Sequence, residues 1–157
     1  MVGGGYISVE FAGIFHGLGA KTAQLYRGEL FLRGFDNDIR LTLADEMLKR
    51  GIDLRFKTGV ARIEKHGDLL NATLIDGSVI EANQILYATG RVPKTRGLGL
   101  ENAGVELRQS GAVVVDPYLR SSVESIYAIG DCTDRLMLTP VAITEGTAVA
   151  NTLFNNR

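Results

Sequence analysis

Residues 3–8 read GGGYIS and run directly into VEFAGIF, residues 9–15. The spacing Gly3-x-Gly5-x-x-Ser8 is a variant of the glycine pattern that joins a strand to a helix in dinucleotide-binding folds. The first glycine permits a tight turn, and the second lets a pyrophosphate approach the N–H groups at the helix N-terminus. Ser8 stands where the common pattern has Gly or Ala. A glycine-rich turn that binds nothing is the alternative interpretation.

Only Met1 and Val2 precede this turn, although a strand usually has about 5 to 6 residues. We therefore expect a chain cut from a longer one, with a truncated first strand. Unpaired backbone groups on the neighbouring strands would then leave a gap in the sheet.

Apolar periodicity and turn residues outline the remaining elements. Asp36 is a good N-cap for a helix whose apolar face is Ile39, Leu43 and Met47, and Thr139 with Pro140 is typical of a helix start. The apolar run 84–88 predicts a buried central strand. We predict helices over 6–18, 37–50 and 139–154, and strands over 22–26, 53–57, 60–64, 70–75, 79–81, 84–88, 112–115 and 126–129.

This order predicts an α/β fold, with a Rossmann-like NAD(P)-binding domain that combines a parallel sheet and an antiparallel β-meander. Asp76-Gly77 is the hairpin signal inside the meander. An irregular stretch begins at Val92-Pro93, so we place a domain boundary there, between residues 1–92 and 93–157. The second part is expected to be a smaller β/α piece.

The end of the second predicted strand indicates which dinucleotide binds. An NAD site needs an acidic residue there for the ribose 2′-hydroxyl, but this chain has Tyr26 followed by Arg27. Arg27 and Arg33 are suited to a 2′-phosphate, which a carboxylate would repel. Glu29 between them weakens the case, and two solvated surface arginines remain the alternative.

Composition excludes several classes of function. The 157 residues carry 17 Lys and Arg against 18 Asp and Glu, which gives no general affinity for nucleic acid or an anionic membrane. No apolar run approaches the roughly 20 residues of a membrane span, and residues 1–10 do not resemble a signal peptide. Cys132 is the one cysteine, which fits a reducing compartment, so we expect a cytoplasmic location.

With these residues in view, the chain resembles the glutathione reductase branch of the pyridine nucleotide–disulfide oxidoreductases. The resemblance rests on GGGYISVEFAGIF, YRGELFLRGFD, YATGRVP and YAIGDCTDRLMLTPVAITEG, which follow the family's order and spacing. It implies a homodimeric flavoenzyme in which NADPH reduces FAD, FAD reduces an active-site disulfide, and that disulfide reduces glutathione disulfide. Trypanothione-type and dihydrolipoamide-type relatives and a stand-alone nucleotide-binding module are the alternatives. The lack of an acid at Tyr26 argues against the dihydrolipoamide type.

The resemblance assigns roles to residues of the first half. Gly3, Gly4 and Gly5 would form the turn at the nucleotide, with Ile7 beside it. Tyr6 resembles a tyrosine that covers the nicotinamide pocket, and Glu10 a glutamate that reaches the nicotinamide amide. Ordinary structural roles remain open for both, as a half-buried aromatic residue and as a helix-start carboxylate. The other matching residues are the 2′-phosphate arginines Arg27 and Arg33 and the segment under the nucleotide, Gly90 and Arg91.

In the second half, the resemblance implies a returning segment of the FAD-binding domain. Asp131 resembles an aspartate that binds the FAD ribityl chain, although a turn residue would look the same. Thr139 would begin a helix whose N–H groups face the flavin pyrimidine ring, where they stabilise negative charge. Met137 resembles a residue of the nicotinamide pocket or is plain packing. Cys132 is interpreted as a small packing residue.

The resemblance also shows what these residues do not supply. The family's CxxxxC pair, FAD-binding glycine motif, interface domain and His–Glu pair have no match here. His16 and His66 match no family residue and are interpreted as surface residues. We therefore expect no catalytic residue in this chain and no reductase activity from it alone.

Overall fold

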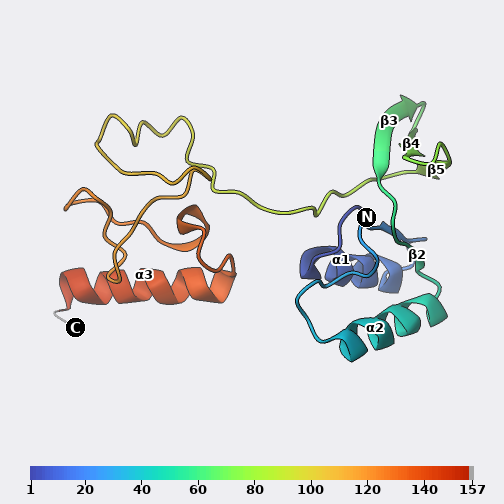
Figure 1. Cartoon of the computed structure of the whole chain (residues 1–157), viewed down its shortest axis with the longest axis horizontal. Coiled ribbons are helices and arrows are strands. Elements are labelled where there is room, and N and C mark those ends of the chain that lie inside the picture. The colour runs from blue at the N-terminus through green and yellow to red at the C-terminus, as the bar shows by residue number, and fades with distance from the viewer. Residues whose placement is uncertain (156–157) are drawn as a thin grey trace. The chain divides into compact units, whose positions relative to one another are not determined.

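The computed structural model describes residues 1–155, which form two compact units, Met1–Gly90 and a second that begins at Arg91 (Figure 1). The first unit contains both a parallel and an antiparallel sheet together with two helices. This mixed architecture confirms the predicted α/β class. Among the described residues, no helix is long and apolar enough to cross a membrane.

The parallel sheet of the first unit is short. Strand β1 (Ala23–Leu25) pairs in parallel with β2 (Asp53–Arg55), and Val2 forms parallel bridges to Leu25 and Tyr87. The Val2 N–H donates to the Leu86 carbonyl over 2.8 Å, and the Val2 carbonyl accepts from Ala88 over 2.8 Å. The prediction of a gap with unpaired backbone groups is therefore wrong at Val2, because the backbone of Val2 pairs with the segments on both sides.

Residues 84–88 do not form the buried central strand predicted from their apolar run. Their only bridge is the one between Tyr87 and Val2 within the described residues, and Tyr87 is 53% exposed. Ile85 and Leu86 are half-buried. The prediction failed because a long ladder needs a long neighbour, and Met1 and Val2 alone lie between this segment and β1.

Two helices accompany this sheet. Helix α1 (Tyr6–Gly17) follows the glycine turn, and α2 (Asn37–Lys49) begins after the predicted cap, Asp36, whose carboxylate accepts from the N–H groups of Asp38 and Ile39. The predicted apolar face of α2 is partly wrong. Ile39 is 60% exposed, because the helix buries instead a stripe centred on Ala44 and Met47. One hydrophobic core cluster is formed by Ala12, Phe31, Leu32, Ala44, Met47 and Ile52.

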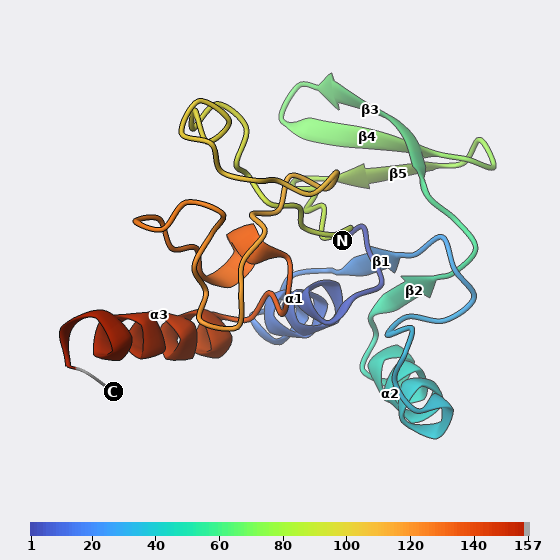
Figure 2. The same cartoon turned by 60° about the vertical axis from the view of Figure 1, so that its left-hand side comes forward.

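The antiparallel sheet is the predicted meander. Strands β3 (Val60–His66), β4 (Leu69–Leu74) and β5 (Val79–Ala82) pair in that order, as Figure 2 shows. The predicted Asp76-Gly77 turn joins the last two strands, and Gly77 adopts φ +83° there. Within the first unit, both views draw this sheet on the opposite side of β2 from α2.

The second unit is mostly irregular chain that ends in a long helix. A short 3₁₀ helix, η1 (Gly130–Thr133), precedes α3 (Thr139–Phe154). The strands predicted over 112–115 and 126–129 are reduced to isolated bridges, Leu107 to Val113 and Arg120 to Tyr127. Their N–H groups are paired with separate loop carbonyls rather than along one ladder, as in the bond from Val113 to Cys132.

The start of α3 differs from its predicted form by one position. The N-cap is Leu138, not Thr139, and no side chain caps the helix. Thr139 is therefore the first helical residue and Pro140 the second. A shift of this size is common at helix ends, and Pro is tolerated because the first turn lacks N–H partners in any case.

Candidate functional site

The glycine-rich turn brings the chain backbone into close contact with its surroundings. Gly3 adopts φ +144°, and a Cβ atom there would lie 2.2 Å from the Ala88 carbonyl oxygen. A Cβ atom at Gly4 would lie 2.4 Å from the Tyr26 ring, whereas one at Gly5 would meet no atom within 4 Å. The first two glycines are thus required by the fold, and the third leaves an open space at the start of α1.

A buried polar pair lies under this turn, which sequence reasoning missed. Gln24 on β1 and Ser8 on α1 are 1% and 0% exposed. The Gln24 amide nitrogen donates to the Gly3 carbonyl over 3.1 Å and lies 3.3 Å from the Ser8 hydroxyl oxygen. This contact explains how Ser8 is accommodated at the third motif position. A glutamine inside an apolar strand was the available signal.

The open space at Gly5 is suited to an anion. Gly5 is the N-cap of α1 and provides no side-chain cap, and a helix N-terminus without a side-chain cap favours an anion. The Gly4 carbonyl accepts from the Leu32 N–H over 2.7 Å, which ties the turn to the loop after β1. Ile7 is half-buried in the first turn, and Tyr6 (39% exposed) and Glu10 are on the surface.

The two predicted phosphate-binding arginines lie on that loop, which spans residues 26–35. Arg27 and Arg33 are exposed, and neither side chain forms an ion pair with any carboxylate in the described range. Glu29 between them is paired with Lys57, with 3.0 Å between Oε1 and Nζ. The hydrogen bond and charge of Lys57 lower the pKa of Glu29. The carboxylate that weakened the sequence argument is therefore held by a lysine.

In the second unit, all four predicted residues line one open pocket of about 450 Å³. Arg91, Asp131, Met137 and Thr139 lie on its wall, together with residues of η1 and the start of α3. Arg91 donates to the Asp131 carboxylate in an ion pair. A carboxylate has several acceptor positions, so Asp131 retains some for a ligand hydroxyl.

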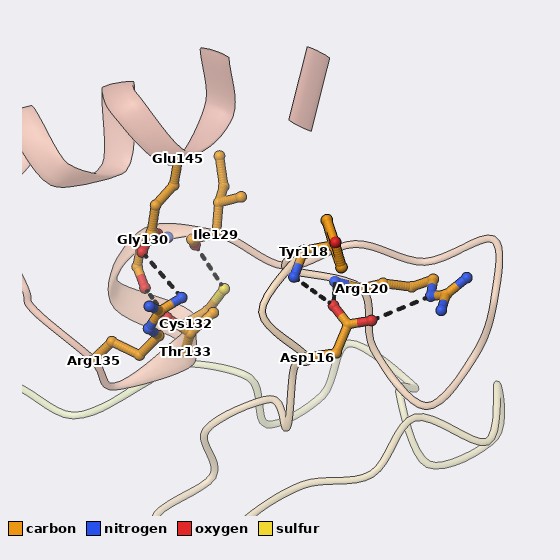
Figure 3. Close-up of polar contacts among 9 residues, drawn as sticks. All are labelled: Asp116, Tyr118, Arg120, Ile129, Gly130, Cys132, Thr133, Arg135 and Glu145. Carbon is orange, nitrogen blue, oxygen red and sulfur yellow. Dashed lines mark hydrogen bonds and ion pairs between the residues drawn. The ribbon is translucent and has the colours of Figure 1, made fainter. Parts of the chain in front are cut away.

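The turn that carries Asp131 is held from α3, as Figure 3 shows. Glu145, whose side chain is 12% exposed, accepts from the Gly130 N–H over 2.7 Å and lies 3.7 Å from Arg135. The Thr133 hydroxyl donates to the Gly130 carbonyl over 2.8 Å, and the Cys132 thiol contacts the Ile129 carbonyl at 3.0 Å. Sequence reasoning did not single out Glu145.

Gly90, His66 and His16 are the other residues considered from the sequence. Gly90 is exposed with φ +145°, and His66 is exposed at the end of β3. His16 is not a plain surface residue, because its Nε2 atom lies 2.8 Å from the Arg50 carbonyl oxygen and joins the C-terminal ends of α1 and α2. No group of His, Cys, Asp and Glu side chains among residues 1–155 is arranged to hold a metal ion.

Comparison with known proteins identifies the family of this chain. A family model described as pyridine nucleotide-disulphide oxidoreductase matches residues 1–146. The chain belongs to this family. The resemblance noted from the sequence motifs is thereby confirmed.

Several members of the pyridine nucleotide-disulphide oxidoreductase family match nearly the whole chain. Glutathione reductase of Burkholderia cepacia is 51% identical over 157 residues, which cover 100% of this chain and 35% of the relative. Trypanothione reductase of Leishmania donovani is 45% identical over 99% of this chain and 33% of the relative. The structure of the HOCl-induced flavoprotein disulfide reductase RclA from Escherichia coli is 33% identical, with a TM-score of 0.90 over 99% of this chain and 36% of that one. The chain thus spans about a third of the length of these relatives.

Proposed function

We propose that this chain is the NADPH-binding portion of a flavin-dependent disulfide reductase whose substrate is glutathione disulfide. Residues 1–92 would form the NADPH-binding domain and residues 93–157 a part of the FAD-binding domain. The substrate class is supported by the 51% identity to a glutathione reductase. The trypanothione-type relative stays the main alternative, at 45% identity.

One observation carries the NADPH part of the proposal. Arg27 and Arg33 lie on a loop that is bonded to the glycine-rich turn, and the nearby Glu29 carboxylate is paired with Lys57. Tyr26 occupies the position of the NAD-type acid. Two exposed arginines on a loop bonded to the turn that starts a helix suit a nucleotide with both a pyrophosphate and a 2′-phosphate.

The other nucleotide contacts follow from the same turn. The pyrophosphate would lie in the space at Gly5, against the turn Gly3–Gly5 and the first-turn residue Ile7. Tyr6 and Glu10 would contact the nicotinamide end, and the segment of Gly90 and Arg91 would pass beneath the nucleotide. Support for these roles comes from the surface positions of Tyr6 and Glu10 and from the exposed backbone at Gly90.

FAD would be contacted by the pocket of the second unit, whose side chains fit a flavin. Asp131 offers acceptors for ribityl hydroxyls, and Arg91 fixes the orientation of that carboxylate. The N-terminus of α3 at Thr139, which no side chain caps, would face an electron-rich ring edge. Met137, which the resemblance assigns to the nicotinamide pocket, lines the same pocket as Thr139. When bound, FAD supplies the transfer of two electrons from NADPH to a disulfide.

The remaining parts of the proposal concern partners and place. We propose a cytoplasmic protein that binds NADP(H) and FAD, and a homodimer for the full-length enzyme. The near balance of charge and the single cysteine, Cys132, support a reducing compartment and a protein that contacts neither nucleic acid nor membrane.

Calorimetric titration of the chain with NADP⁺ and NAD⁺ tests this proposal. We expect NADP⁺ to bind more tightly, and the preference to disappear in Arg27→Ala and Arg33→Ala while weak NAD⁺ binding persists. Circular dichroism of each variant checks that the fold is retained. A preference for NAD⁺, or no nucleotide binding by the folded chain, would contradict the proposal.

A further inference from the structure

The loop that carries Arg27 and Arg33 has little regular structure to hold it. Residues 26–35 lie between β1 and α2 and contain no helix or strand longer than an isolated bridge. The position of two long arginine side chains relative to the turn depends on the path of this loop. A contact that fixes the path of this loop therefore influences whether the two guanidinium groups can bind one phosphate together.

Arg40, in the first turns of α2, is bonded to the middle of this loop. Its Nε atom donates to the Phe31 carbonyl over 2.7 Å, and one terminal nitrogen donates to the Leu30 carbonyl over 2.7 Å. Both carbonyls lie between Arg27 and Arg33 along the chain. Two parallel bonds from one planar guanidinium fix direction as well as distance, which a lysine ammonium does not reproduce.

The same loop segment is joined to the glycine-rich turn. Phe31 is 0% exposed, and its ring packs against Phe56 with 5.6 Å between the ring centres. The next residue, Leu32, donates its N–H to the Gly4 carbonyl over 2.7 Å. The carbonyls that Arg40 holds are therefore adjacent to the bond that ties the loop to the turn.

The place of Arg40 in its helix is unusual for a cation. Cations near a helix N-terminus are disfavoured by the helix dipole, so charge alone does not account for an arginine there. In the part of the chain that the structure describes, Arg40 forms no ion pair with a carboxylate, and its remaining contact is a 3.4 Å bond to the Asn37 side chain. The two loop carbonyls are its closest contacts.

We propose that Arg40 is a positioning residue that sets the preference for NADP⁺ over NAD⁺, by fixing the loop on which Arg27 and Arg33 lie. This inference rests on the proposed NADPH site. Arg40 acts through the two other arginines, so its loss weakens recognition of the 2′-phosphate and leaves binding of the nucleotide common to both cofactors unchanged.

The test compares Arg40→Lys and Arg40→Met with the wild-type chain, by titration with NADP⁺ and with NAD⁺. We expect both variants to bind NADP⁺ about tenfold more weakly, because the loop is no longer preorganised, and to bind NAD⁺ as the wild type does. Amide hydrogen exchange over residues 28–34 should become faster in both variants. Arg50→Lys and Arg50→Met are matched controls, because Arg50 is exposed at the other end of α2 and its side chain forms no bond within residues 1–155.

Each outcome has a separate meaning. If Arg40→Lys binds NADP⁺ as the wild type does while Arg40→Met does not, Arg40 contributes only charge and the positioning role is wrong. Equal weakening of NADP⁺ and NAD⁺ binding, or a loss of folding in both variants, would also overturn it, because Arg40 would then support the fold in general. If the wild-type chain itself shows no preference for NADP⁺, the proposed NADPH site fails, and this inference fails with it.

Discussion

At Gly5 the backbone leaves a space in which a Cβ atom would meet no atom within 4 Å. We predict that Gly5→Ala folds normally but loses most of its affinity for NADP⁺ and NAD⁺ alike, because the methyl group occupies the space of the pyrophosphate. Thermal unfolding and calorimetric titration measure the two effects. Unchanged nucleotide affinity in a folded Gly5→Ala chain would show that the phosphates lie elsewhere.

Gly13 is the matched control for that substitution. It lies within α1, and a Cβ atom there would also meet nothing within 4 Å. Gly13→Ala should leave nucleotide binding unchanged and stabilise the helix by about 0.5–1 kcal/mol, because alanine loses less backbone entropy than glycine.

The pair between Glu29 and Lys57 gives a second prediction at the residue scale. Lys57→Met should weaken NADP⁺ binding roughly twofold to threefold at neutral pH, because an unpaired carboxylate then repels the 2′-phosphate, and Glu29→Gln should strengthen it by a similar factor. NAD⁺ titrations serve as the control. If the two substitutions change NADP⁺ affinity in the same direction, this account of Glu29 is wrong.

The pH dependence of this effect follows from the lowered pKa of Glu29. The pairing is fully present above the ordinary pKa of the carboxyl group, 4.5, and is lost as pH falls through the lower value of the folded chain. The affinity difference between the wild type and Glu29→Gln, measured by calorimetric titration, should therefore be constant from about pH 7 to about pH 8, where the 2′-phosphate is also a dianion.

At the scale of elements, η1 and α3 are joined by the bond from Gly130 to Glu145. Glu145→Ala should destabilise this contact by about 1–3 kcal/mol, because the Gly130 N–H loses its acceptor, and Glu145→Gln should cost less, because an amide oxygen still accepts. Hydrogen exchange at the Gly130 amide measures the local effect. If the Gly130 amide exchanges equally slowly in the wild type and in Glu145→Ala, Glu145 does not stabilise the contact between η1 and α3.

The elements also show what the sequence could and could not predict. Periodicity predicted α1, the Asp36 cap and the meander, because these depend on local pattern. It failed at residues 84–88, where pairing depends on how much strand lies alongside, and at Ile39, where tertiary packing selects the buried face.

The candidate sites likewise contain residues that could be predicted from the sequence and residues that could not. The family resemblance assigned roles to Arg91, Asp131, Met137 and Thr139, which line one pocket. Gln24 and Arg40, which support the sites, belong to no motif, and Glu145 lies within a quoted motif but had no role assigned to it. The contacts of all three come from the tertiary fold. Sequence offered only weak signals for them, such as a cation at the start of α2.

At the scale of the whole molecule, we predict that the 157-residue chain alone does not reduce glutathione disulfide with NADPH. Its one thiol, Cys132, contacts the Ile129 carbonyl and has no second cysteine with which to form a disulfide. The measurement is the loss of NADPH absorbance over time, with FAD and glutathione disulfide added. Turnover above that of a Cys132→Ser control would point to disulfide chemistry at Cys132 itself, and equal turnover in both would show a route that needs no thiol.

The central claim is that Arg27 and Arg33 hold a 2′-phosphate. If they do, phosphorus NMR of bound NADP⁺ should detect their charge through the titration of that phosphate. A phosphate monoester has a second pKa of about 6, and two nearby guanidinium groups favour its dianion. We predict that the bound 2′-phosphate titrates at a lower pH than in free NADP⁺, and that this shift disappears when both arginines are replaced by alanine. A bound nucleotide whose 2′-phosphate titrates as it does in free solution would contradict the claim.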